Sequence, residues 1–184
     1  MDFIEMPKIA RLSRLCTVTE KIDGTNASIY IGDPETGDGD LFLTGSRTRW
    51  ITPTDDNFGF SRWAHANKEE LMKLGPGHHF GEWRGLGIQR KYGLVEKRFS
   101  LFNTFRWSDE KGERPACCHV VPVLFEGLFD TVVISALLNE LKDRGSRAAL
   151  GFMNPEGIVV YHQAAKNFFK KTIIGDEKPK GSKE

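Results

Sequence analysis

Short runs in which apolar and polar residues alternate recur along this chain, separated by segments rich in glycine, proline, aspartate and asparagine. Alternation with a period of two is typical of half-buried strands, and the separating residues favour turns. The pattern predicts a hairpin loop at 32–40 and a polar loop at 107–115. It predicts strands at 15–19, 27–31, 41–45, 98–105, 120–125 and 165–172, with a turn into a further buried strand at 154–161.

Two segments instead show helical spacing. Residues 61–74 place Trp63, Leu71 and Leu74 near one face, and glycine and proline follow at 75–77. Asp130 can cap a second helix that runs to Arg144. Many strands with two helices predict an α+β fold, with two antiparallel-rich sheets and flanking helices around a nucleotide groove. Pro122 cannot donate to a ladder, so its strand is expected at a sheet edge.

Composition indicates an ordinary globular protein of one domain. The 184 residues are 39% hydrophobic and 28% charged, with a formal net charge of +1, so any nucleic-acid contact must come from a local patch. We expect a domain at 1–174, a charged flexible tail at 175–184 and no C-terminal accessory domain. The apolar segments of the chain are too short for a membrane span. Three cysteines, two of them adjacent, favour a reducing, cytoplasmic location without a structural metal.

The candidate chemistry begins at residues 20–26, which read EKIDGTN. Lys21 offers an amine that can become a nucleophile, and Asp23 offers a carboxylate for a ribose or a metal. Gly24 allows close backbone approach, and Asn26 offers both a donor and an acceptor. Taken alone, this short run also fits an exposed turn before a strand.

Four further blocks follow in order. Residues 46–49 bring Arg47 to the end of the sheet that carries Lys21, where its planar fork suits a phosphate or ribose. Residues 79–89, HFGEWRGLGIQ, contain Glu82, and the chain has no Gly-Lys-Ser/Thr of a P-loop. The others are 99–102, ending in Phe102, and 156–161, EGIVVY.

Together these blocks resemble the covalent nucleotidyltransferases, and the wording of residues 20–26 and 79–89 is most similar to the RNA ligase 2 type of ATP-dependent RNA ligases. The resemblance implies that Lys21 takes AMP, that Phe102 stacks on adenine and that Glu82 contacts ribose. It implies ATP and Mg²⁺ (or Mn²⁺), with Glu156 near the metal. The implied catalytic residues are Lys21, Glu156 and Lys170. The implied nucleotide contacts are Glu20, Lys21, Asp23, Asn26, Arg47, Glu82, Phe102, Glu156 and Lys170.

The last block departs from the family pattern of two lysines at alternate positions. Lys170 and Lys171 are adjacent, and Thr172 stands where the second lysine would fall. On a strand, Lys170 and Thr172 share one face and Lys171 lies on the other. Lys170 is therefore the predicted phosphate contact, while Lys166 and Lys171 remain open.

The expected function is an ATP-dependent RNA ligase that seals 5′-phosphate and 3′-hydroxyl ends of RNA or a nicked duplex. We expect a monomer, with a separate partner as one source of an accessory domain. The alternatives are a minimal DNA ligase, a capping-type guanylyltransferase, or a nucleotide-binding domain that has lost sealing. Five basic residues are expected to hold the polynucleotide: Arg84, Arg90, Lys91, Lys97 and Arg98.

Overall fold

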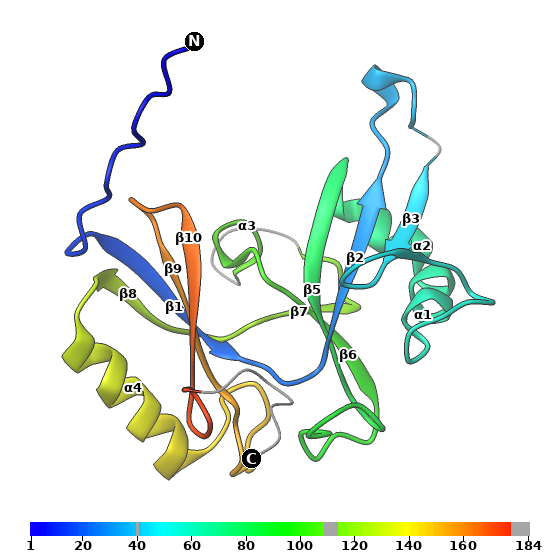
Figure 1. The fold of residues 1–184 in the computed structure, drawn as a ribbon. Coiled ribbons are helices and arrows are strands. Elements are labelled where there is room, and N and C mark those ends of the chain that lie inside the picture. Colours follow the sequence, from blue (N-terminus) through cyan, green and yellow to red (C-terminus); the bar gives the residue numbers. More distant parts are fainter. Residues whose placement is uncertain (40, 109–113, 178–184) are drawn as a thin grey trace.

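Two sheets that lie side by side form the computed structural model, which describes residues 1–39, 41–108 and 114–177 (Figure 1). The four-stranded sheet has the order β10-β9-β1-β8, and the six-stranded sheet has the order β4-β3-β2-β5-β6-β7. Helices cover the outer side of each sheet (Figure 1). The predicted α+β class, with antiparallel-rich sheets, is confirmed.

The four-stranded sheet is antiparallel throughout. Its strands are β1 (Leu15–Lys21), β8 (Val123–Leu128), β9 (Gly157–His162) and β10 (Asn167–Thr172). Alternate residues of β1 and β9, among them Val18 and Ile158, pack against α4 (Thr131–Arg144). The predicted cap is present, because the Asp130 side chain accepts a hydrogen bond from the Val132 amide. The opposite face of this sheet carries Lys21.

The six-stranded sheet is antiparallel except where β6 pairs with β7. Its strands are β2 (Thr25–Ile31), β3 (Phe42–Gly45), β4 (Trp50–Ile51), β5 (Gly77–Gly85), β6 (Lys97–Leu101) and β7 (Cys118–Val120). One face buries Ile29, Trp83 and Phe99 with α1 (Phe60–Ala66) and α2 (Lys68–Leu71). We call the other face, which carries Asn26 and Glu82, the open face.

Several predicted elements have different bounds or contents. The helix expected at 61–74 is divided, because the backbone and side chain of Asn67 both cap α1; α2 and a 3₁₀ turn (Met72–Leu74) follow. The strand expected at 98–105 ends at Leu101, and α3 (Thr104–Trp107) follows. A second 3₁₀ turn, Pro34–Thr36, lies in the predicted loop at 32–40.

Pro122 marks the crossing from one sheet to the other. The strand expected at 120–125 is two strands, β7 and β8, and each lies at the edge of its own sheet. The Pro122 carbonyl accepts a hydrogen bond from the Glu20 amide, which interrupts the β1–β8 register near Thr19. The predicted edge location is therefore correct, although the single strand is not.

The predicted tail begins in contact with the domain. Asp176 accepts hydrogen bonds from the Thr172 amide and the Lys171 side chain, and both contacts hold the chain against β10. The rest of the predicted tail, 178–184, lies outside the described residues, as do 40 and 109–113 of the predicted loops. In the described part of the chain, no helix has the length and apolar character needed to cross a membrane.

Candidate active site

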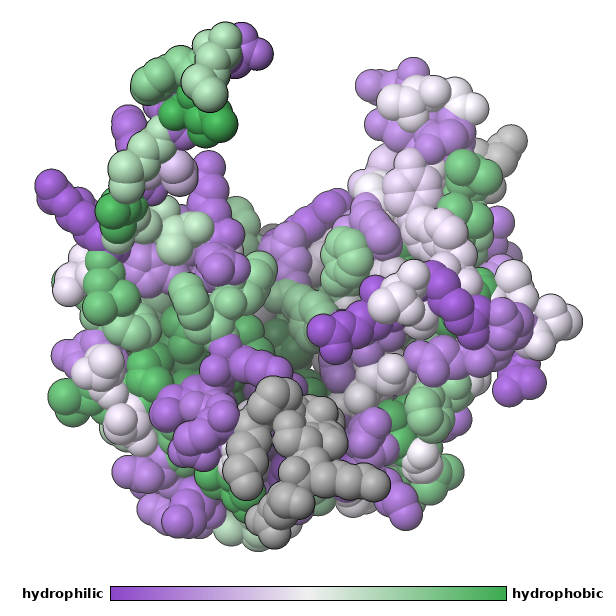
Figure 2. All heavy atoms as spheres, in the orientation of Figure 1, coloured by the Kyte–Doolittle hydropathy of each residue, from purple (hydrophilic) through white to green (hydrophobic). Residues whose placement is uncertain are grey.

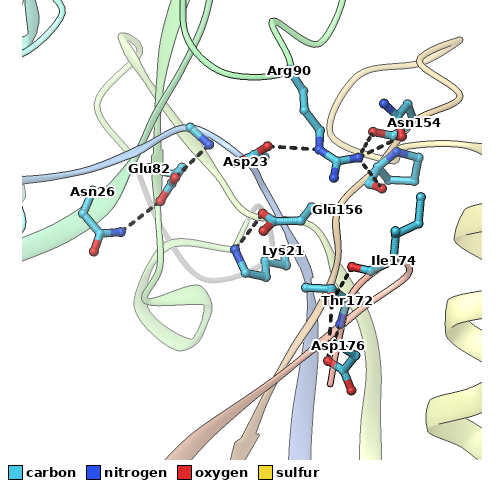
Figure 3. A network of polar contacts seen from close by, with 12 residues as sticks. Lys21, Asp23, Asn26, Glu82, Arg90, Asn154, Glu156, Thr172, Ile174 and Asp176 are labelled. Atoms are coloured by element: carbon cyan, nitrogen blue, oxygen red, sulfur yellow. Dashed lines mark hydrogen bonds and ion pairs between the residues drawn. The ribbon is translucent and has the colours of Figure 1, made fainter. Parts of the chain in front are cut away.

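Lys21 lies at the end of β1, where the two sheets approach each other (Figure 3). Its Nζ is 2.6 Å from Oε2 of Glu156, which directly precedes β9. The pair forms because Lys21 and Gly157 are direct partners in the β1–β9 ladder. The Lys21 side chain is 22% exposed and that of Glu156 is 8% exposed, so the amine is reachable while its partner is enclosed. The sequence-predicted nucleophile and the predicted metal-side carboxylate are therefore in contact.

The turn after Lys21 is bound to the open face of the six-stranded sheet. Glu82 of β5 accepts hydrogen bonds from the Gly24 amide at 2.9 Å and from Nδ2 of Asn26 at 3.0 Å (Figure 3). Only glycine fits at position 24, because a Cβ there would lie 2.4 Å from the Trp83 carbonyl oxygen. Glu82 therefore holds the nucleophile's loop through both of its oxygens.

Burial makes Glu82 a weak acid. Loss of solvent raises the pKa of its carboxyl group from an ordinary value of 4.5 to about 7, against the opposing effect of the Gly24 and Asn26 hydrogen bonds and the charge of Lys21. The nearby Glu156 carboxylate adds to the rise. Protonation of Glu82 thus changes near neutral pH, close to the candidate nucleophile.

Asp23 is held by residues that the sequence did not single out for this purpose. Its Oδ2 accepts from Nε of Arg90 at 3.0 Å, and its amide donates to the Tyr92 hydroxyl at 2.8 Å. Arg90 also donates to the carbonyl and side-chain oxygens of Asn154 and to the Pro155 carbonyl (Figure 3). Arg90 thus ties the loop after Lys21 to the segment before Glu156. The only signal in the sequence was its position directly after the 79–89 block.

Glu20 faces away from Lys21. Its side chain is 1% exposed, and its carboxylate accepts hydrogen bonds from the Ser146 hydroxyl and from the amides of Arg147 and Ala148. The carboxylate is thus occupied by residues 146–148. Where the sequence predicted a nucleotide contact, the structure shows the Glu20 side chain anchoring a loop.

The register of β10 distinguishes the three lysines of the last block. Lys170 and Thr19 both oppose Val159, so Lys170 lies on the face that carries Lys21. Lys171 opposes the core residue Ile158 on the other face and pairs with Asp176. Lys166 lies in the turn between β9 and β10, at the end remote from Lys21. The geometry therefore supports the choice of Lys170.

Phe102 and Arg47 lie near the open face without contacting Lys21. The Phe102 amide donates to the Phe80 carbonyl, which continues the β5–β6 pairing by one step, and the ring is 40% exposed. Arg47 lies in the exposed turn between β3 and β4. Among the described residues Arg47 makes no hydrogen bond or ion pair, so its guanidinium is available for a ligand.

The structure argues against two of the five members of the predicted basic patch, Arg84 and Arg90. Arg84 is 3% exposed, and Arg90 is bound to Asp23 and Asn154. Lys97 donates to the Phe58 carbonyl and Arg98 pairs with Glu96. Lys91 is exposed. The burial of Arg84 and the contacts of Arg90 could not be read from spacing alone.

The site is an open groove, and Figure 2 shows the molecule hollowed between its two halves. A separate cavity of about 500 Å³ lies between the loops at 92–94 and 147–152, and its lining includes none of the predicted site residues. In the described ranges no three His, Cys, Asp or Glu side chains are grouped to hold a metal ion. A metal in the groove would therefore depend on Glu156 together with substrate phosphates and water.

Comparison with known proteins places the fold and these residues in a family. The family model described as RNA ligase matches residues 14–173, so the chain belongs to the RNA ligase family. This range includes both sheets and every predicted site residue. The fold and the family together define a nucleotidyltransferase-type catalytic domain. A search of curated proteins found no match.

Solved structures of a Naegleria gruberi RNA ligase share the fold. A variant without ligand has 20% identity and a TM-score of 0.62, covering 87% of this chain and 50% of that one. A variant with ATP and Mn has 21% identity and a TM-score of 0.61, covering 87% and 49%. A variant with AMP and Mn has 22% identity and a TM-score of 0.61, covering 88% and 50%. The chain thus spans about half the length of these relatives.

Proposed function

We propose that this chain is an ATP-dependent RNA ligase that works through AMP bound covalently to Lys21. The observation that carries the proposal is the contact between Lys21 and Glu156, made at the point where the Glu82-bound turn leaves β1. An exposed turn with ordinary charges would not enclose its lysine's partner to 8% exposure. The membership of the RNA ligase family supports the same reading.

ATP is a substrate in this scheme. The Lys21 amine attacks the α-phosphorus, a nitrogen–phosphorus bond forms, and the bond to the β-phosphate oxygen breaks to release pyrophosphate. The amine must first lose a proton, and the Glu156 carboxylate, to which it donates a hydrogen bond at 2.6 Å, can accept it. AMP then passes to a 5′-phosphate, and attack by a 3′-hydroxyl joins the ends and releases AMP.

The remaining site residues have binding roles. Lys170, on the same face as Lys21, would offset charge on the phosphates, and Phe102 offers a half-exposed ring to the adenine. Glu82 and Arg47 are the candidates for the ribose. Mg²⁺ or Mn²⁺, when bound, would neutralise the leaving pyrophosphate, and Glu156 is the carboxylate best placed to contribute.

The polynucleotide substrate follows from the family and remains part of the proposal. RNA ends, free or in a nicked duplex, are the expected substrate, and we propose that the chain acts as a monomer. A separate protein that supplies further RNA contacts is a second part of this proposal.

Two assays test the function and separate it from its alternatives. The protein is incubated with labelled ATP or GTP, and covalent label is followed after denaturation; label from GTP alone would indicate capping-type chemistry. It is then given nicked substrates in RNA and in DNA. Sealing of RNA supports the proposal, sealing of DNA alone supports the DNA ligase, and AMP attachment without sealing of either supports the nucleotide-binding alternative.

A further inference from the structure

Aromatic side chains cover the open face beyond the turn that Glu82 holds. On β5 the same face carries Glu82, then Phe80, then His78; on β2 it carries Asn26, Ser28 and Tyr30 in matching positions. Trp50 of β4 extends this surface from the side of β3. We call Tyr30, Trp50, His78 and Phe80 the aromatic platform.

The members of the platform contact one another in a continuous series. The Trp50 indole stacks on His78 with centroids 5.4 Å apart and an interplanar angle of 27°. The rings of His78 and Phe80 are 4.0 Å apart, and Tyr30 meets His78 edge-on at 6.0 Å. The Tyr30 hydroxyl donates to Asp38, which fixes that ring. The platform is therefore a defined surface and not a set of independent rotamers.

Gly45 lets the indole lie across the sheet. It opposes both Ser28 and Trp50 in the ladder, and a Cβ there would lie 3.3 Å from the indole and 2.6 Å from the Ser28 hydroxyl. Trp50 nevertheless remains 50% exposed and Phe80 53% exposed. Aromatic residues that only fill a core are rarely exposed to about half of their surface, as these two are.

We propose that the aromatic platform binds unpaired bases of the polynucleotide end that is to be joined. Sheet aromatics stack bases in known RNA-binding modules, and every base offers a face for such stacking. The platform begins one row, about 7 Å, from the row of Glu82 and Asn26, so it continues directly from the candidate AMP site. This inference rests on the proposed function, since it names the substrate form used at that site.

Charge favours unpaired strands over duplex as the occupant. Two of the five cations expected near β5 are withdrawn from a duplex, because Arg84 is buried and Arg90 is bound to Asp23 and Asn154, and fewer phosphate contacts mean weaker duplex binding. Two cations lie in the turn that leads from β3 into Trp50: Arg49 is paired with Asp55, whereas Arg47 makes no ion pair among the described residues. Stacking with one nearby cation suits bases that are free to leave a helix.

The test measures binding of a dye-labelled single-stranded RNA by anisotropy, without ATP, to the full chain. Trp50→Leu keeps apolar volume without a ring and should weaken binding at least about fivefold, while Trp50→Phe should retain most of it. Phe169→Ala is the matched control, because Phe169 is 51% exposed but lies on the four-stranded sheet, opposite Val160. A blunt RNA duplex should bind more weakly than the single strand and respond little to Trp50→Leu.

Equal affinity of Trp50→Leu and Phe169→Ala for single-stranded RNA would overturn the platform. So would duplex binding as tight as single-strand binding with the same response to Trp50→Leu. Attachment of AMP from ATP alone is measured on the same proteins and should not differ between them. If the unaltered protein takes no AMP, the proposed function fails, whereas the RNA-binding comparison still reports on the platform.

Discussion

Glu20 and Arg84 bind the same residue, Ala148, from the two sheets of the molecule. The Glu20 carboxylate on β1 accepts from the Ala148 amide, and the Arg84 guanidinium on β5 donates to the Ala148 carbonyl, each at 2.9 Å. Both side chains are nearly inaccessible, at 1% and 3% exposure. The loop that contains Ala148 is therefore bound by two buried side chains of opposite charge, one from each sheet.

Glu20→Gln should therefore lower stability by about 2–4 kcal/mol, because buried donors of residues 146–148 lose acceptors and Arg84 loses a nearby anion. Urea unfolding measures the change. Glu126→Gln is the control: Glu126 is exposed on β8, and its substitution should cost under about 0.5 kcal/mol. Unchanged stability of Glu20→Gln, with a raised requirement for ATP, would instead support the nucleotide contact predicted from sequence.

Arg90→Ala should slow AMP attachment about tenfold or more. It removes the cation bound to Asp23 and the link to Asn154, so the loops on both sides of the Lys21–Glu156 pair are released. Arg90→Lys should restore little, since an ammonium cannot span the oxygens that the fork spans. Lys91→Ala, at the exposed neighbour, serves as the control in a single-turnover assay. Equal rates for Arg90→Ala and Lys91→Ala would return Arg90 to the polynucleotide patch predicted from sequence.

Lys170→Ala should reduce AMP attachment and raise the ATP concentration needed for it, because Lys170 shares a face with Lys21. Lys171→Ala should leave attachment unchanged. It breaks an ion pair with Asp176 whose partners are 47% and 32% exposed, worth at most about 1 kcal/mol. Rates measured over an ATP series compare the two variants. A larger defect in Lys171→Ala would contradict the register argument.

Glu82 should make stability fall with rising pH. Its pKa is about 7 in the folded protein and near 4.5 when exposed, so the folded state binds the proton more tightly. This contribution is fully present below about pH 4.5 and is lost as pH rises through about 7. Relative to Glu82→Gln, the unaltered protein should lose roughly 2–3 kcal/mol between pH 5 and pH 8. The hydrogen-bond acceptor that Glu82→Gln removes shifts the stability difference between the two proteins by an amount that does not depend on pH. A stability difference that stays constant across this range would refute the raised pKa.

Local patterns predicted most strands of this fold, because the alternation of a half-buried strand is visible in its residues. They did not assign a strand to β5 or β4, and β10 is exposed along most of its length. They also placed Lys21, Glu82 and Glu156, which lie in blocks that resemble a known family. They could not show that Glu20 turns away from the groove or that Arg84 is buried. Both outcomes depend on contacts with residues 146–148. Ser146 is 126 positions from Glu20 in the sequence, and no alternation or motif in residues 146–148 indicates the contact.

The bounds that differed have local causes. Asn67 ends α1 because its side chain and amide both bond to the Trp63 carbonyl, a competition that helical periodicity does not reveal. Pro122 correctly predicted a strand at a sheet edge. The sequence does not show that the residues before and after Pro122 join different sheets, which makes them two strands, β7 and β8. Lys170 was chosen correctly for its face, since alternation along a strand is a property of sequence alone.

Covalent attachment of AMP to Lys21 can be tested by the mass of the intact protein after incubation with ATP and Mg²⁺, followed by peptide mapping. We expect the addition of one AMP, located on Lys21 and removed by acid. Lys21→Ala should remain unmodified and folded, while Lys166→Ala, altered in the β9–β10 turn, should take AMP like the unaltered protein. AMP found on another residue, or on the Lys21→Ala protein, would show that Lys21 is not the nucleophile.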